Sequence, residues 1–260
     1  MSVRSILEDV AAGRVSISEA EKKLRLLALE SIGSSIKLDV GREIRRGVPE
    51  VIYAEGKIID DLIEATKKFL ESCGRVIISR VNREQVKALE EHFKERYVFN
   101  FYEKARMVVV KESFFNVEKV GKVGILAAGT ADIPIAEEAR IIAEEMGCET
   151  IYEYDVGIAG IHRLFPALKK MIEADVACIV VVAGMEGILP SIVASLTDVP
   201  VIGVPRSVGY GLGAGGVGAL TTMLQSCVLG LLVVNIDNGV NAGASAALIA
   251  RRTRGTSNNS

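Results

Sequence analysis

The chain has 260 residues, of which 49% are hydrophobic and 25% are charged, and its formal net charge is −2. This composition is typical of a soluble globular protein and excludes a disordered or fibrous chain, and a near-neutral chain lacks the basic surface that duplex nucleic acid requires. The four cysteines lack CxxC spacing, so neither a zinc site nor a disulfide framework is expected.

The N-terminal segment carries charges throughout and shows no continuous apolar stretch or cleavage site of a secretory signal. The longest apolar run, "CVLGLLVVNI", has about half of the roughly 20 residues that a membrane-spanning helix needs. We therefore expect a cytoplasmic protein and interpret this run as a buried strand.

Residues 1–118 are predicted to form an N-terminal helix, a basic loop and a small α/β domain. Ser16 or Ser18 can cap a helix over 17–30, and patterns of helix and strand alternate from residue 60 to residue 113. Between them, "DVGREIRRGVPEVIYAEGK" is rich in turn residues and arginine, including Arg45. It is either a solvated linker or an anion-binding loop.

Residues 119–254 are predicted to form a second α/β domain, followed by a disordered tail over 255–260. Five apolar strand candidates recur, each followed by a helix candidate: "KVGILAA", "ETIYEYDV", "VACIVVVA", "PVIGVP" and "LGLLVVNI". Near-continuous Val and Ile runs indicate strands covered on both faces, as in a parallel sheet. Strict strand-helix alternation then predicts a doubly wound, three-layer α/β fold.

In such a sheet, ligands bind beyond the carboxyl ends of the strands, so the loops that follow the strands should form one rim. The first loop offers Gly129, Thr130 and Asp132, although Asp132 is equally a structural N-cap. The glycine-rich loop after the fourth strand carries Arg206 and is either a phosphate cradle or a mobile lid.

Two further titratable residues follow strands in this half of the chain. His162 stands at the start of a helix, where the dipole favours a neutral ring that can accept a proton. Glu186 directly follows an apolar strand and is either functional or a partner of the helix dipole. Cys227 lies where a helix gives way to a strand, a common place for a buried structural thiol; a nearby base or cationic substrate would make it a nucleophile.

The motifs "AAGTADIPIAEEA", "DVGIAGIHRL", "VVAGMEGILPSIVASL", "GVPRSVGYG" and "LQSCVLG" resemble the LarB family of nickel-pincer nucleotide biosynthesis. The 121–253 region also resembles the aminoimidazole ribonucleotide carboxylase and mutase fold. That family's Gly-Ser-x-Ser-Asp signature is similar to residues 129–132 here, with one hydroxyl missing. The Gly- and Ala-rich helix "AGASAALIA" is expected to suit close packing between subunits.

The LarB resemblance implies carboxylation of the pyridinium ring of nicotinic acid adenine dinucleotide and hydrolysis of its phosphoanhydride. The products are pyridinium-3,5-biscarboxylic acid mononucleotide and AMP, with carbon dioxide or bicarbonate as co-substrate. It also implies a homo-octamer with shared sites, no tightly bound cofactor and a possible Mg²⁺ ion.

The resemblance implies that Cys227 is the nucleophile. His162 is the candidate base by its position, and Glu186 and Asp132 are candidates for handling protons or orienting His162. The residues expected to bind substrate are Gly129, Thr130, Asp155, Gly157, Arg163, Gly184, Arg206, Ser207, Asn241 and Arg45. Two alternatives stay open: an aminoimidazole ribonucleotide carboxylase or mutase, which needs no cysteine, and a non-catalytic sensor of pyridine dinucleotides.

Overall fold

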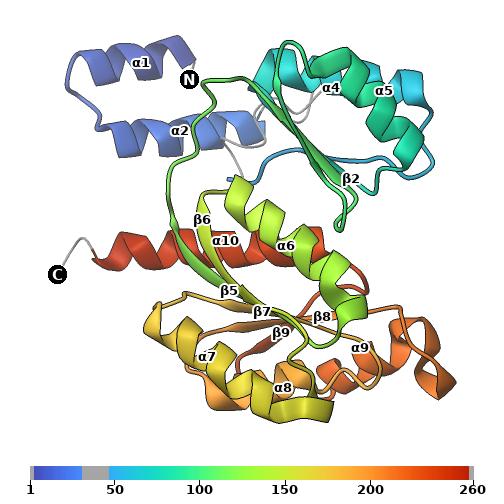
Figure 1. The fold of residues 1–260 in the computed structure, drawn as a ribbon. Helices are drawn as coiled ribbons and strands as arrows, with labels where there is room; N and C mark the ends of the chain where they lie inside the picture. The colour runs from blue at the N-terminus through green and yellow to red at the C-terminus, as the bar shows by residue number, and fades with distance from the viewer. Residues whose placement is uncertain (1–2, 31–46, 258–260) are drawn as a thin grey trace.

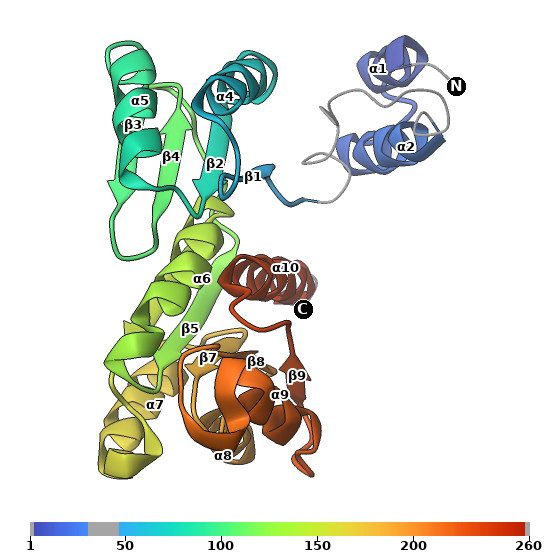
Figure 2. The same cartoon turned by 90° about the vertical axis from the view of Figure 1, so that its right-hand side faces the viewer.

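The structure, a computed structural model, describes residues 3–30 and 47–257. It contains a helical hairpin, a domain built on a four-stranded sheet and a domain built on a five-stranded sheet (Figure 1). The hairpin pairs α1 (Val3–Ala11) with α2 (Ile17–Glu30) and lies to one side of both sheets (Figure 2). Of the two predicted caps, Ser16 begins α2: its hydroxyl accepts from the Glu19 amide at 3.2 Å.

The smaller domain has the strand order β1-β2-β4-β3, with β1 parallel to β2 and β4 antiparallel to both of its neighbours. Its elements are β1 (Val51–Tyr53), α4 (Ile59–Cys73), β2 (Arg75–Ser79), α5 (Arg83–Phe93), β3 (Val98–Tyr102) and β4 (Met107–Lys111). The sequence pattern did not indicate β1 or β3. The predicted basic loop therefore needs a correction, because its last part contains β1, a strand too short to show an alternating pattern.

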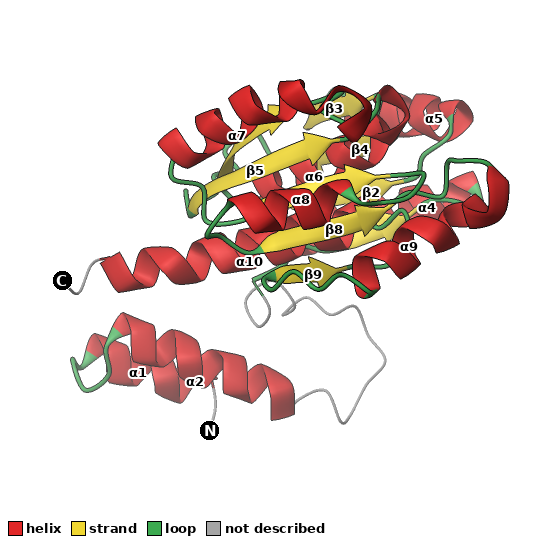
Figure 3. Cartoon of the chain, turned by 90° about the horizontal axis from the view of Figure 1, so that it is seen from below, coloured by secondary structure: helices red, strands yellow, loops and turns green. Residues whose placement is uncertain are grey.

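The larger domain confirms the predicted doubly wound fold: five parallel strands in the order β6-β5-β7-β8-β9. The strands are β5 (Gly121–Ala127), β6 (Cys148–Glu153), β7 (Ile179–Ala183), β8 (Val201–Pro205) and β9 (Leu231–Val233). One face is covered by α6 (Ile133–Glu145) and α10 (Gly239–Ser257), and the other by α7 (Leu164–Glu173), α8 (Leu189–Leu196) and α9 (Val217–Leu224). Figure 1 shows the strands lying between these two helical layers, and Figure 3 views the same strands and helices from below.

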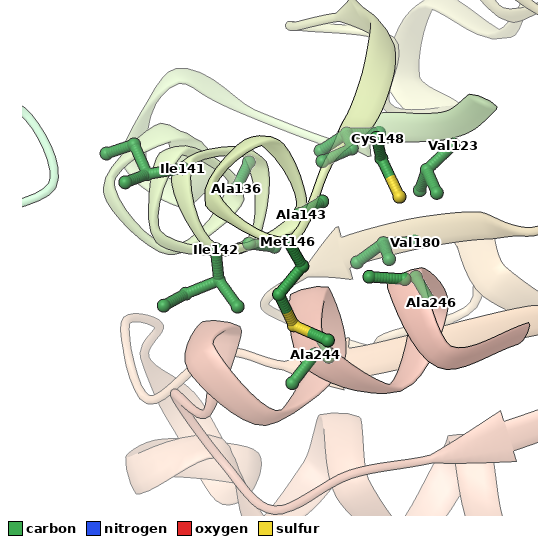
Figure 4. Packing of buried hydrophobic residues seen from close by; sticks show 14 of the residues in the cluster. Val123, Ala136, Ile141, Ile142, Ala143, Met146, Cys148, Val180, Ala244 and Ala246 are labelled. Carbon is green, nitrogen blue, oxygen red and sulfur yellow. The ribbon is translucent and has the colours of Figure 1, made fainter. Parts of the chain in front are cut away.

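Small residues bring α10 into backbone contact with α6. A Cβ atom on Gly239 would overlap the carbonyl oxygen of Ile135, and one on Gly243 would overlap that of Ala139. Around this crossing, Ala136, Ala143 and Ala246 are fully buried (Figure 4). These small residues therefore serve a helix crossing within the chain, and their expected part in contacts between subunits stays a prediction.

Two further expectations about the C-terminal part are corrected. The predicted buried strand around residue 231 is only three residues long and lies at the sheet edge, where Leu229 is 91% and Leu232 53% exposed. An edge strand has a neighbour on one side only, so its apolar side chains are covered less than those of a central strand. The helix α10 also continues through Ser257, into the segment expected to be a disordered tail; residues 258–260 lie outside the described residues.

Ion pairs join the smaller domain to α6 of the larger one. Glu145 accepts from Arg75 at 3.2 Å and from Lys111 at 2.9 Å, and Glu138 lies 3.0 Å from the Nε atom of Arg80. Glu138 and Glu145 are two helical turns apart, so they lie on the same face of α6. No helix within the described ranges is long and apolar enough to cross a lipid bilayer.

Candidate functional site

The loops that follow the parallel strands lie at the carboxyl edge of the five-stranded sheet and contact one another through backbone atoms. A Cβ atom on Gly157 would lie 2.7 Å from the carbonyl oxygen of Ala128, and one on Gly184 would lie 2.8 Å from that of Val208. These two glycines therefore allow neighbouring loops to pack closely. Gly129 has no such constraint, since its Cβ would meet only Asp132 at an ordinary 3.6 Å.

Asp132 is buried at this rim, and its carboxylate points back into the loop. The Gly129 amide donates to its Oδ2 atom at 2.8 Å, and the side chain makes no cap for α6. The structural alternative of a forward N-cap is therefore wrong. Burial raises the pKa of Asp132, opposed by the Gly129 hydrogen bond and the charge of Arg206. A carboxyl with a raised pKa is suited to exchanging a proton with a ligand.

Arg206 lies beside Asp132 and is held by several contacts. Its Nη1 atom donates to Asp237 at 2.6 Å and its Nη2 atom donates to the carbonyl oxygen of Ala131 at 3.1 Å. Its Nε atom lies 4.0 Å from the Asp132 carboxylate and, among the described residues, is buried without a hydrogen-bond partner. The guanidinium group is thus fixed in place while one of its donors stays unused.

Asp237 organises this cluster, and the sequence reasoning did not select it. Its carboxylate accepts from the Ser207 amide at 2.9 Å and from the Ser207 hydroxyl, as well as from Arg206. Burial alone would raise the pKa of Asp237, but the hydrogen bonds from Ser207 and Arg206 outweigh it, and the pKa lies below its usual value. Its position directly after a strand, in "NIDNG", was the signal that could have identified it.

A second, more exposed cluster follows β6. Asp155 has a left-handed backbone (φ 60°) and pairs with Arg163, and both side chains are more than 40% exposed. His162 lies next to Arg163, in a 3-10 turn just before α7, so its predicted place at the start of a helix is confirmed. Its ring is exposed and has no hydrogen-bond partner among the described side chains and backbone groups.

The remaining predicted site residues are not brought into these clusters. Thr130 and Glu186 are exposed on the rim, and their side chains make no hydrogen bond to other groups in the described part of the chain. Asn241, in the first turn of α10, lines a cleft of about 760 Å³ between the two domains. Arg45 lies outside the described residues.

Cys227 is exposed in the turn between the end of α9 and the start of β9. The interpretation of this cysteine as an ordinary buried thiol is therefore wrong. The turn is held by the Ser226 hydroxyl, which accepts from Ser191 at 2.8 Å. Because β9 is parallel to its neighbour, Cys227 lies toward the amino end of the edge strand, whereas Asp132 and His162 follow carboxyl ends. One chain does not bring the thiol to the rim.

Comparisons with known proteins give two family matches and several relatives. A model described as the LarB/PurE-like N-terminal domain matches residues 29–112, and one described as AIR carboxylase matches residues 122–259. An uncharacterized protein of Methanocaldococcus jannaschii is 49% identical over 96% of this chain and 97% of its own length. The N5-carboxyaminoimidazole ribonucleotide mutase of Thermotoga maritima is 33% identical over 49% of this chain and 74% of its own length. That of Pyrococcus horikoshii is 35% identical over 51% and 72%.

Proposed function

The chain belongs to the AIR carboxylase family and carries the LarB/PurE-like N-terminal domain, and from this premise we propose that it carboxylates nicotinic acid adenine dinucleotide. In the same site, water hydrolyses the phosphoanhydride of the carboxylated dinucleotide, which gives pyridinium-3,5-biscarboxylic acid mononucleotide and AMP. The observation that carries the proposal is the rim cluster of Asp132, Arg206 and Asp237. It combines a cation held by Asp237 and Ala131 with a carboxyl group of raised pKa.

The chemistry requires a nucleophile, because a pyridinium carbon is electron-poor and cannot attack carbon dioxide. The Cys227 thiolate adds to the ring carbon para to nitrogen, and the electron pair of the broken ring π bond moves to the nitrogen. The resulting dihydropyridine attacks carbon dioxide through the adjacent ring carbon. His162 then removes the proton from that carbon, and the C–S bond breaks to release the thiolate and restore the aromatic cation.

The place of Cys227 requires a second copy of the chain to complete the site. The thiol is exposed, and around its turn Leu224 is 65%, Leu229 91% and Leu232 53% exposed. Exposed apolar side chains of this kind are typical of a surface that another protein covers. This supports an assembly in which one copy brings its thiol to the rim of another, as expected for a homo-octamer.

The other predicted residues take supporting roles in this proposal. Arg206 and Arg163 hold substrate carboxylate or phosphate groups, for which a guanidinium fork is well shaped. Asp132 and Glu186 handle protons or orient the His162 ring. Across the described residues, no three His, Cys, Asp or Glu side chains gather to hold a metal ion, so no step is assigned to magnesium.

The test is incubation of the whole protein with nicotinic acid adenine dinucleotide and ¹³C-bicarbonate. Liquid chromatography with mass spectrometry should detect AMP together with a labelled biscarboxylate mononucleotide. Mass spectrometry of the protein should detect a pyridine adduct on Cys227. Absence of both AMP and labelled product contradicts the carboxylase proposal, and binding of the dinucleotide without turnover would instead indicate a sensor.

The relatives named as mutases favour a second candidate, rearrangement of N5-carboxyaminoimidazole ribonucleotide within the same fold. That reaction needs no thiol. Cys227→Ser should therefore leave turnover of the imidazole ribonucleotide intact while it abolishes carboxylation of a pyridinium ring. Assays of both substrates with both proteins separate the two functions.

A further inference from the structure

Among the described residues of the smaller domain, Arg80 is the side chain whose hydrogen bond and ion pair reach the rim cluster. This residue directly follows β2, and its guanidinium reaches across the junction to the larger domain. Its Nε atom lies 3.0 Å from Glu138 on α6, and its Nη2 atom donates to the backbone carbonyl of Asp237 at 2.6 Å. Arg80 therefore contacts the same residue whose carboxylate holds Arg206.

The contact is made by two residues in uncommon backbone conformations. Arg80 has φ 59° and Asp237 has φ 56°. Both values lie in the left-handed backbone region that residues other than glycine rarely adopt. Such conformations persist only where the surrounding contacts enforce them. At Arg80, the Arg106 side chain donates to the carbonyl oxygens of Arg80 and Val81. At Asp237, the amide donates to the Pro205 carbonyl at 2.9 Å.

The segment around Asp237 also packs closely against Glu138 on α6. Glu138 is 3% exposed, and a Cβ atom on Gly239 would lie 2.8 Å from the Cβ of Glu138. The turn from Asp237 to Gly239 therefore rests directly on the glutamate that pairs with Arg80. A change in the position of the Arg80 guanidinium reaches this turn through its hydrogen bond to the Asp237 carbonyl and through Glu138, against which Gly239 packs.

We propose that Arg80 is a positioning residue for the rim: it fixes the turn at Asp237, and through the Asp237 carboxylate it sets the place of Arg206 and Ser207. The smaller domain then serves to keep Arg206 and Ser207, the proposed anion-binding residues of the rim, in position. The structural part of this inference is independent of the reaction, and its effect on turnover rests on the proposed function.

The second ion pair at the junction provides a matched control. Lys111 pairs with Glu145 at 2.9 Å, and its side chain is 23% exposed, compared with 25% for Arg80. The two carboxylates are 7% and 3% exposed and lie on the same helix. Only the Arg80 pair reaches Asp237, so Lys111→Met tests the effect of a weakened junction without a direct change at the rim.

The experiment is hydrogen exchange measured by mass spectrometry on the full-length protein, without any substrate. The amides to follow are those of Ser207 and Asp237, which donate to Asp237 Oδ1 and to the Pro205 carbonyl. In Arg80→Met their exchange should rise on the order of 10-fold, the size of a typical coupling through a positioning residue. In Lys111→Met it should stay at the wild-type rate. Equal changes in the two variants, or no change in Arg80→Met, overturn the inference.

A conservative variant covers the case in which Arg80→Met folds poorly. Lysine at position 80 retains the charge for Glu138 but lacks the planar fork that also reaches the Asp237 carbonyl. Arg80→Lys should therefore keep the junction and still raise exchange at Ser207, and an unchanged rate in that variant contradicts the inference.

Kinetics provide the second readout. Arg80→Met should raise the KM for the dinucleotide about 10-fold while kcat changes less, since Arg206 binds substrate in the proposal. Lys111→Met should match the wild type. If wild-type protein releases no AMP, the proposed function fails, yet the exchange result still decides the role of Arg80.

Discussion

The predicted catalytic and binding residues fall into two groups that differ in burial and in hydrogen bonding. Asp132, Arg206 and Ser207 are largely buried, and hydrogen bonds to Gly129, Ala131 and Asp237 fix them. Cys227, His162 and Glu186 are exposed. A single chain therefore prearranges the part of the rim that handles anions and protons, and leaves open the part that we expect to form and break bonds.

This difference fits a site that a second copy completes. Donors held in place before substrate arrives stabilise developing charge without the cost of reorganisation. A thiol and an imidazole that lie on separate exposed turns require a substrate, and a neighbouring chain, to bring them together. Substitutions in the exposed group should therefore affect chemistry with little effect on folding, and those in the buried group should affect both.

The largest effect is expected for Cys227→Ser. A serine hydroxyl is a far weaker nucleophile toward the pyridinium ring, so formation of the carboxylated product should fall by on the order of 10⁴-fold or more, as when other enzyme nucleophiles are removed. Because Cys227 is exposed, the thermal midpoint should stay the same. Product is measured by chromatography, and Cys73→Ser, on α4, is the matched control. Comparable activity in both variants would show that the Cys227 thiol takes no part in the reaction.

His162→Asn should reduce turnover by about 10² to 10⁴-fold, the usual contribution of a general base. Because the proposed base acts after the ring has added to sulfur, the Cys227 adduct should accumulate in this variant and be visible by mass spectrometry. The chain has one other histidine, His92 on the exposed side of α5, and His92→Asn should behave as wild type. A His162 variant that loses activity and shows no adduct argues against the assigned order of steps.

The next prediction contrasts a half-buried and an exposed carboxylate at the same rim. Asp237→Asn removes the charge that holds Arg206 and Ser207, so kcat/KM should fall about 30-fold, corresponding to about 2 kcal/mol of coupling. The free energy of unfolding should fall by about 1–3 kcal/mol, because partners of a buried hydrogen-bonded group are left unsatisfied.

Asp155→Asn is the exposed counterpart, measured by urea denaturation. It removes the partner of Arg163, but exposed ion pairs contribute at most about 1 kcal/mol, so its unfolding free energy should stay near that of the wild type. An equal loss of stability in both variants would remove the distinction between the two groups.

The sequence predicted the larger domain well because its elements carry strong, long patterns. Continuous Val and Ile runs indicated the central strands, and strict alternation of strand and helix fixed the order in the chain. The elements that it missed are those with weak patterns: β1 has three residues, and β3 has no buried side chain and no regular alternation of burial. The exposure of β9 also had no local signal, because the place of a strand within a sheet depends on all the others.

For the site, the sequence located the rim but not its internal partners. Each predicted residue after a strand lies on a loop at the carboxyl edge, as the topology requires. The link between Arg206 and Asp237 joins loops after two different strands, and the link from Asp237 to Arg80 joins residues of two domains that are 157 positions apart in the sequence. Such pairings depend on tertiary distances, and no spacing within one segment encodes them.

The last prediction concerns Glu138→Gln, which changes stability with pH. Burial raises the pKa of Glu138 to about 7, despite the opposing charge of Arg80; Asp237 adds to the rise and Arg206 opposes it. A raised carboxyl pKa means that the folded state binds its proton more tightly than the unfolded state. The contribution of Glu138 to stability is therefore fully present below about pH 4.5 and is lost as the pH rises to about 7.

Glutamine has no proton to lose at this position and still offers an oxygen to the Arg80 Nε atom. The unfolding free energy of Glu138→Gln relative to wild type should consequently rise between pH 5 and pH 7.5, by up to a few kcal/mol, and level off above that range. Urea denaturation at a series of pH values measures it, and Glu145→Gln, at the other junction pair, shows whether the slope belongs to Glu138 alone. A difference that stays constant with pH would mean that Glu138 is ionised throughout, with Arg80 compensating fully for its burial.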